Sequence, residues 1–175
     1  METMEQVRPA IAAQSRSTRT ARVAATREQI ALQLSVRLRG LTPQQAQELA
    51  GLARERSFAA GEVIFNEGDQ ASEIYLLLEG RVFLGAKFSE SAGHVTFASI
   101  GPSEFLGWSA LVHPHRKTAY AEAVADTEVL VFRSRELLDL CDQDPAMGYV
   151  IMRCLLATVG QRLIATRQRM LDIFG

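Results

Sequence analysis

Apolar and polar residues recur along this chain in two rhythms, one helical and one strand-like. Between residue 30 and about residue 58, and again from residue 144 onward, apolar side chains return every three or four positions, which is the spacing of an amphipathic helix. Between these regions the chain consists of short β-branched and aromatic stretches separated by Gly, Asp, Asn and Ser, which is typical of strands joined by turns. The strand-like stretches are residues 63–65, 74–78, 82–84, 95–97 and 128–132. A meander of such short strands predicts a barrel or roll.

Two local signals mark where helices begin. Thr42 can cap a helix that starts at Pro43, and Gln45 can complete the capping box. Asp144, with a proline directly after it, marks the start of a longer helix of roughly 25 residues or about 40 Å, preceded by a short helix over residues 136–141. Because the apolar stripe of the long helix extends beyond what a small roll can cover, we expect part of it to meet a second copy of the chain.

The composition of the first part of the chain differs from the rest. Residues 1–29 are rich in Arg, Ala, Ser and Thr and carry almost no large apolar side chains, so we expect a basic and flexible arm. Residues 30–143 are expected to form the N-terminal helices and the roll, and residues 144–175 the long C-terminal helix for dimerisation or signalling.

The overall totals are those of a globular protein. The chain has 175 residues, of which 47% are hydrophobic, and a net charge of −1. No apolar run approaches the roughly 18 residues that a membrane span needs, and no signal segment is visible, so we expect a cytoplasmic protein without a membrane span. Cys141 and Cys154 stand alone, so neither a disulfide framework nor a zinc site is expected.

Glycines at regular spacings interrupt the strand-like region. Gly61, Gly68 and Gly80 fall between predicted strands, where a turn needs a positive φ or a close backbone approach. The stretches Gly61–Asp69 and Ile74–Val82, which contain them, strongly resemble the cyclic nucleotide-binding domain family, including the effector domains of Crp/Fnr-type regulators. The resemblance implies a mainly β fold with flanking helices: a jelly-roll-like β-roll followed by a long C-terminal helix.

The resemblance also implies where a ligand binds. In this family a short helix follows the sequence that here reads Phe105-Leu106-Gly107, and its free N–H groups hold a cyclic phosphate. We call residues 105–111 the cassette. The ligand-binding residues implied by the resemblance are Gly107, Trp108, Ser109 and Ala110 in the cassette and Lys117 and Thr118 after a short loop.

The chain departs from the family pattern at two of these positions. Trp108 replaces a Glu that accepts a hydrogen bond from the ribose, and it would either stack on a flat ligand or fill the ribose pocket. Lys117 replaces an Arg, which keeps the positive charge but loses the planar fork that suits phosphate. Arg116 would take the role of Lys117 if the register shifted. Thr166 on the long helix matches a position from which family members reach the base.

A different kind of site is suggested by His113 and His115, because alternating histidines in a β-barrel are similar to the metal site of cupin enzymes. The cupin pattern needs a Glu soon after the second His, and none stands at that distance. No nucleophile arrangement, Walker loop or pair of apolar carboxylates is readable either. We therefore expect no metal, no catalytic residues and no cofactor.

These patterns predict a non-enzymatic regulatory sensor that binds a small anionic ligand. A cyclic nucleotide, cyclic AMP or cyclic GMP, is the leading candidate, and the C-terminal helix would signal to a protein partner, with a homodimer formed through that helix. The alternative is a degenerate roll without ligand that acts as a dimerisation or docking module. Because the chain ends before a helix-turn-helix could form, sequence-specific DNA binding is not expected.

Overall fold

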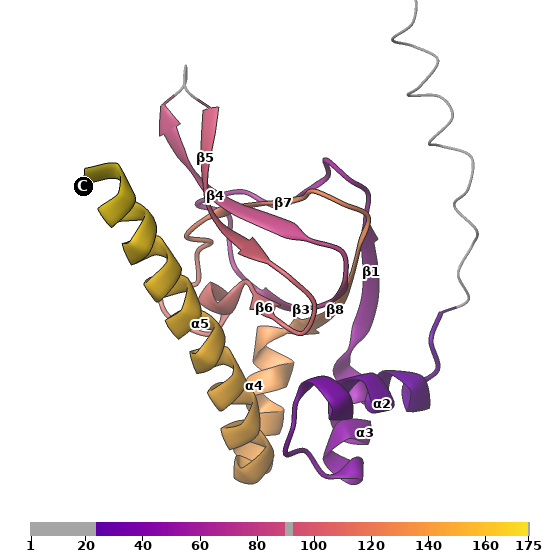
Figure 1. The fold of residues 1–175 in the computed structure, drawn as a ribbon. Helices are drawn as coiled ribbons and strands as arrows, with labels where there is room; N and C mark the ends of the chain where they lie inside the picture. Colours follow the sequence, from indigo (N-terminus) through magenta and orange to yellow (C-terminus); the bar gives the residue numbers. More distant parts are fainter. Residues whose placement is uncertain (1–23, 90–92, 175) are drawn as a thin grey trace, which may run out of the picture.

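Two four-stranded antiparallel sheets form the centre of the molecule, and helices cover one side of it (Figure 1). The computed structural model describes residues 24–89 and 93–174. Sheet A has the order β1-β8-β3-β6 and sheet B the order β2-β7-β4-β5. Their strands are β1 Arg54–Phe58, β8 Thr127–Arg133, β3 Glu73–Glu79 and β6 Phe105–Leu106 in sheet A, and β2 Val63–Phe65, β7 Tyr120–Ala123, β4 Val82–Ser89 and β5 Gly93–Ile100 in sheet B. The predicted β-roll with flanking helices is confirmed.

The helices begin where the capping signals indicate. Thr42 accepts a hydrogen bond from the backbone N–H of Gln45 at the start of α3 (Pro43–Leu52), and the capping box is complete. Asp144 accepts from the backbone N–H of Met147 in the first turn of α5 (Pro145–Phe174). The short helix α4 (Ser134–Gln143) extends further in both directions than predicted.

The boundary of the N-terminal arm differs from the prediction. Helix α2 (Arg27–Arg37) begins inside the segment 1–29, because Thr26 and Gln29 form a second capping box that the composition concealed. The rest of the arm, residues 1–23, lies outside the described residues.

Strand β3 separates two apolar cores by simple alternation of its side chains. Ile74, Leu76 and Leu78 face the helices and belong to a core shared with α2, α3, α4 and the first half of α5, which we call the helical core. Tyr75 and Leu77 face inward, into a core between the two sheets that we call the roll core. The roll is therefore a filled sandwich with a separate layer of helices.

Helix α5 is embedded at its start and open at its end. Met147, Ile151 and Leu155 are buried in the helical core, while the second half of the helix runs beside β5. By length and composition, Pro145–Gln168 is apolar enough to cross a membrane, which corrects the prediction that no segment is; 33% of that window is buried in the protein. Partial burial against a folded domain is what a long core helix also shows.

Candidate functional site

The cassette is a sharp turn at the free edge of sheet A. Strand β6 pairs with β3 only, and the chain then turns through Gly107, whose φ of 82° lies in the left-handed region. A single 3-10 turn, η1 (Trp108–Ala110), follows in place of the expected short helix. Because so short a turn has only a small dipole, its amides alone make a weak anion site, and the site depends on a nearby cation.

That cation is Lys117, whose side chain points at the turn. A Cβ added to Gly107 would lie 2.9 Å from Lys117 Nζ and 3.0 Å from the backbone oxygen of Glu73. Lys117 is held in place because its N–H donates to Asp69 O and its carbonyl accepts from the N–H of Gly68, both at 2.8 Å. Only glycine therefore fits at position 107, and the ammonium lies directly beside the cassette.

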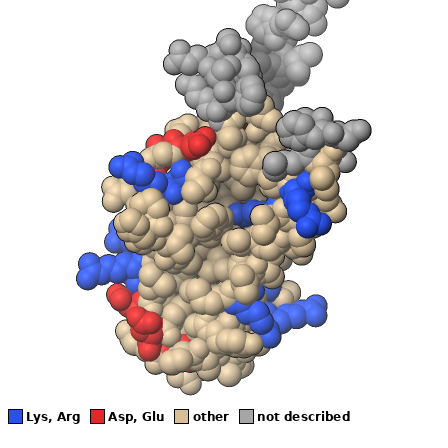
Figure 2. All heavy atoms as spheres, turned by 90° about the vertical axis from the view of Figure 1, so that its left-hand side faces the viewer, with Lys and Arg blue, Asp and Glu red and all other residues tan. Residues whose placement is uncertain are grey.

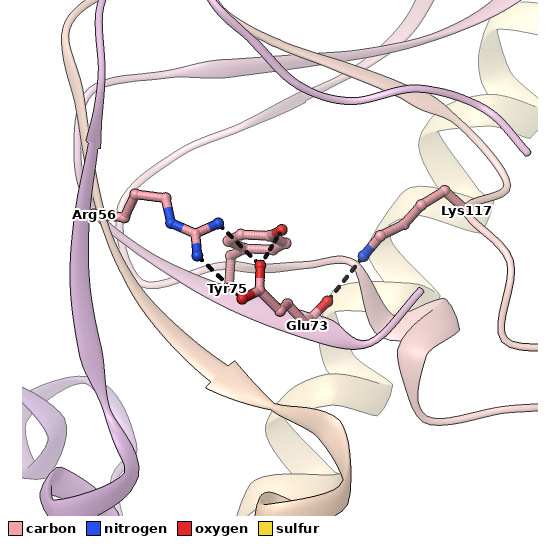
Figure 3. Close-up of polar contacts among 4 residues, drawn as sticks. All are labelled: Arg56, Glu73, Tyr75 and Lys117. Atoms are coloured by element: carbon pink, nitrogen blue, oxygen red, sulfur yellow. Dashed lines mark hydrogen bonds and ion pairs between the residues drawn. The ribbon is translucent and has the colours of Figure 1, made fainter. Parts of the chain in front are cut away.

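The Lys117 ammonium is buried with incomplete compensation. Only 5% of the residue is exposed, and Nζ donates to Glu73 O at 2.8 Å (Figure 3). Nζ also lies 4.5 Å from the centroid of the Phe65 ring and 5.3 Å from that of Tyr75, close enough for cation–π attraction. Burial lowers the pKa of Lys117 to about 8, against the weaker opposing effects of Glu73 and Asp69. The ammonium has three donor hydrogens, and among the described residues Glu73 O accepts one of them, so an anion beside it would be favoured.

The carboxylate of Glu73, whose carbonyl accepts from Lys117, forms hydrogen bonds with Arg56 and Tyr75. Arg56 donates to both oxygens of Glu73, at 2.9 and 3.0 Å, and the hydroxyl of Tyr75 donates to Glu73 at 3.0 Å (Figure 3). Burial raises the pKa of Glu73, but these hydrogen bonds outweigh it and hold the pKa below its usual value. Glu73 therefore accepts from Lys117 through its backbone carbonyl and from Arg56 through its carboxylate. The sequence analysis missed this cluster, because Arg56 and Glu73 carry no motif and meet only through strand pairing.

A surface cleft of about 300 Å³ lies nearby and also borders Glu73. Its other lining residues are Ser72, Arg133, Ser134 and Arg135. Arg133 is largely exposed and forms an ion pair with Glu136 at 3.4 Å. Since exposed charges are screened by solvent, this cleft is a weaker anion site than the buried Lys117.

The two loop histidines have another place in the structure than a metal site. His113 and His115 are exposed, and Nδ1 of His115 lies 3.1 Å from Ala110 O, where it contacts the end of the cassette. Across residues 24–89 and 93–174, no group of three or more His, Cys, Asp or Glu side chains is arranged to hold a metal ion. The cupin hypothesis gains no ligand set from this part of the chain.

Comparison with known proteins settles the family. The sequence model of the cyclic nucleotide-binding domain matches residues 55–144, about half of the chain. This chain belongs to the cyclic nucleotide-binding domain family. The family is regulatory, and some relatives carry the domain as part of an enzyme, as the lysophospholipase named below shows.

Three relatives illustrate the range of the family. The cyclic AMP receptor protein of Thermus thermophilus is 30% identical over 112 residues, which is 63% of this chain and 50% of that protein. Lysophospholipase NTE1 of Chaetomium globosum is 26% identical over 82% of this chain and 9% of that protein. The crystal structure of a putative cyclic nucleotide-binding protein from Geobacter metallireducens has 31% identity and a TM-score of 0.64, and the match covers 75% of this chain and 95% of that one. The chain thus spans half or less of these two curated relatives.

The cyclic nucleotide-binding family positions do not all lie together in this chain. Ser109 and Ala110 are buried beside Gly107, and Lys117 reaches the same turn. Thr118 is exposed. Arg116 is also exposed and donates to Gly68 O at 2.9 Å, so in this structure it is the Lys117 side chain that reaches the cassette turn.

Trp108 packs against the helices. Its indole is half-buried and contacts the helical core. This packing removes much of the apolar surface of the indole from water, which favours its position against the helical core. Stacking on a flat ligand and filling the ribose pocket both stay predictions.

The long helix does reach the cassette, but through another residue than the one predicted. Thr166 is half-buried on α5. The hydrogen bond from α5 to the cassette comes from Arg162, whose Nη2 donates to Phe105 O. No local pattern in the sequence signals this contact, because the two residues are 57 positions apart.

Proposed function

We propose that this chain is a non-enzymatic regulatory sensor domain that binds a small anionic ligand at the cassette turn, with Lys117 as the cation. The observation that carries the proposal is the buried ammonium of Lys117, which lies against the cassette while the carboxylate of Glu73 is bound to Arg56. A buried cation with unsatisfied donors gains most from an anion that brings its own oxygens. The geometry supports a ligand with one negative charge delivered into a tight turn.

A cyclic nucleotide is the leading candidate for this anion. Family membership supports it, as does the similarity to the cyclic AMP receptor protein of Thermus thermophilus. A cyclic phosphodiester carries one negative charge, which matches a site with one ammonium and a short run of backbone amides. No metal or cofactor is part of the proposal.

Ribose recognition is the part of the family mechanism that this site lacks. The family Glu is Trp108, and the indole points into the helical core. A ribose hydroxyl without an acceptor in a buried site loses about 1–3 kcal/mol relative to a paired one. We therefore propose that the site selects mainly for the phosphate.

The signal would pass through α5 to a second copy of the chain, in the cytoplasm. Among the α5 side chains that the structure describes, these large apolar ones are exposed: Tyr149, Met152, Leu156, Leu163, Ile164 and Leu171. Tyr149, Leu156 and Leu163 are seven residues apart, which is the repeat of a coiled-coil seam. The face of the molecule that carries α5 is largely uncharged, with scattered basic and acidic groups, most of them toward its margins (Figure 2). Such a face suits a homodimer.

Calorimetry with cyclic AMP, cyclic GMP and cyclic dinucleotides tests the proposal. Ligand at about 100 times its dissociation constant should add about 2.7 kcal/mol to the free energy of unfolding. Lys117→Met should abolish binding, whereas Arg116→Met removes the neighbouring exposed cation and should leave it intact. Equal binding by the wild type and Lys117→Met would sink the proposed site.

A second function is favoured by one specific observation. Because Lys117 already donates to Glu73 O, the turn is partly satisfied without a ligand, as in a degenerate roll that serves only for dimerisation or docking. The two functions separate in one experiment. A stable dimer whose unfolding temperature shifts with none of these nucleotides would favour the docking module.

A further inference from the structure

Arg162 joins the C-terminal half of α5 to strand β6, which is the first part of the cassette. Its Nη2 donates to Phe105 O, two residues before Gly107. Strand β6 lies at the edge of sheet A, and Glu104 O already accepts from the N–H of Leu77 in β3. Because carbonyls alternate in direction along a strand, Phe105 O points away from β3, and Arg162 takes the place of a further strand.

The Arg162 contact lies beyond the part of α5 that packs in the helical core. Within the described part of α5, the last buried residue is Thr158, one turn before Arg162. Burial lowers the pKa of the guanidinium to about 10, with a weaker opposing effect from Glu104. Its Nε is buried without a hydrogen-bond partner in the described structure. Burying a guanidinium costs free energy of desolvation, and here the hydrogen bond to Phe105 O offsets part of it. That bond depends on the exact position of the carbonyl, whereas the packing of an aliphatic side chain would not.

Phe105 is attached to the helices at two points. Its ring lies in the helical core with Ile151, in the first half of α5. Its carbonyl accepts from Arg162, in the second half of the same helix. A shift of the backbone at Phe105 therefore acts on both halves of α5. In the described residues after Thr158, the second half has no fully buried side chain to resist such a shift.

We infer that Arg162 is the positioning residue that couples the cassette to the C-terminal half of α5. The inference rests on the proposed function, because it assigns a route for the signal of that same site. An anion bound at the cassette turn, with Lys117 as its cation, adjusts that turn and strand β6, and Phe105 O transmits the adjustment to the guanidinium. By linkage, whatever displaces the second half of α5 acts back on the cassette.

Hydrogen exchange of the full chain tests this coupling, measured by mass spectrometry with and without saturating cyclic AMP. In the wild type, cyclic AMP should change the exchange of residues 159–168. Arg162→Met should still bind cyclic AMP by calorimetry, while the change over residues 159–168 is lost. Arg167→Met removes an exposed cation from the same helix and should behave like the wild type. Arg162→Lys keeps a donor and should restore part of the response.

Each result decides between distinct outcomes. A response of residues 159–168 that persists in Arg162→Met overturns the coupling and leaves the proposed function intact. The same holds if cyclic AMP binds to the wild type and residues 159–168 do not respond. Absence of binding heat in the wild type, for cyclic AMP and the other nucleotides, overturns the proposed function, and the coupling falls with it.

Discussion

Lys117 places an ammonium group at a site where burial disfavours its charge. An arginine there would remain charged at any relevant pH, whereas burial brings the pKa of this lysine to about 8, within the range where proteins are assayed. The groups facing it are Glu73, whose pKa is lowered, Tyr75, whose pKa is raised mainly by burial, and Asp69. Neither Glu73 nor Tyr75 changes protonation near pH 8, so the lysine is the group that titrates there.

This predicts that the affinity for an anionic ligand falls with pH. The ligand needs the ammonium form, and above the free pKa of about 8 that form must first take up a proton. Between about pH 7 and pH 9 the dissociation constant should rise about tenfold. Lys117→Arg should bind with no such dependence over this range. Isothermal calorimetry at several pH values measures it, and a flat profile in the wild type would remove Lys117 from the binding site.

Gly107 makes a second prediction at the same scale. Gly107→Ala should abolish ligand binding, because the new Cβ meets Lys117 Nζ at 2.9 Å and Glu73 O at 3.0 Å. Gly68→Ala is the matched control, since Gly68 has nearly the same φ, 85° against 82°, with open space around it. Both variants bear the strain of a positive φ, of order 1 kcal/mol. Titration with cyclic AMP should therefore show a loss in Gly107→Ala alone; equal losses would assign the effect to backbone strain.

Among the elements, those with an internal pattern were predicted and those without one were not. Strands β3 and β8 are apolar runs, and α3 and α5 have caps, so their positions follow from local chemistry. Strand β1 was missed because its residues Arg54–Phe58 are mostly charged or polar and only Phe58 is buried. Strand β7 was missed because its inward residues are alanines, and β6 because it has only two residues.

The site follows the same rule at longer range. Gly107 and Lys117 were predicted because the family resemblance carries them, residue by residue. The contact of Arg162 with Phe105 and the pairing of Arg56 with Glu73 join residues 57 and 17 positions apart, and both depend on how elements pack. The direction of Trp108 is likewise a choice between two apolar cores, which no local pattern decides.

Docking of the first half of α5 gives a prediction at the scale of one element. Leu155 is 5% exposed in the helical core, so Leu155→Ala should lower the free energy of unfolding by about 2–5 kcal/mol. Leu32→Ala on α2 makes the same chemical change at a residue that is 68% exposed, and its effect should stay within about 0.5 kcal/mol. Urea unfolding followed by circular dichroism measures both. Similar midpoints for the two variants would mean that α5 is not anchored by this core.

At the scale of the whole molecule, the proposed ligand site and the proposed dimer face lie on different parts of the fold. The cassette lies where sheet A ends, and α5 passes beside it with one face in the helical core and the other open (Figure 1). A face with apolar residues at a seven-residue spacing is buried most effectively against its own copy, because a symmetric pair matches each residue with its equivalent. Any change of the α5 position would then be read at the dimer interface.

A charge placed in this face should separate the two copies. Leu156 is 71% exposed, so in a single chain Leu156→Glu changes little, whereas in a dimer it buries two carboxylates beside each other without partners. Light scattering during gel filtration should show the wild type at twice the chain mass and Leu156→Glu at the chain mass. Leu32→Glu, on α2 and 68% exposed, introduces the same charge away from the seam and should stay dimeric. A dimeric Leu156→Glu would place the partner on another face of the molecule, and a monomeric wild type would leave the exposed row of α5 to a different protein.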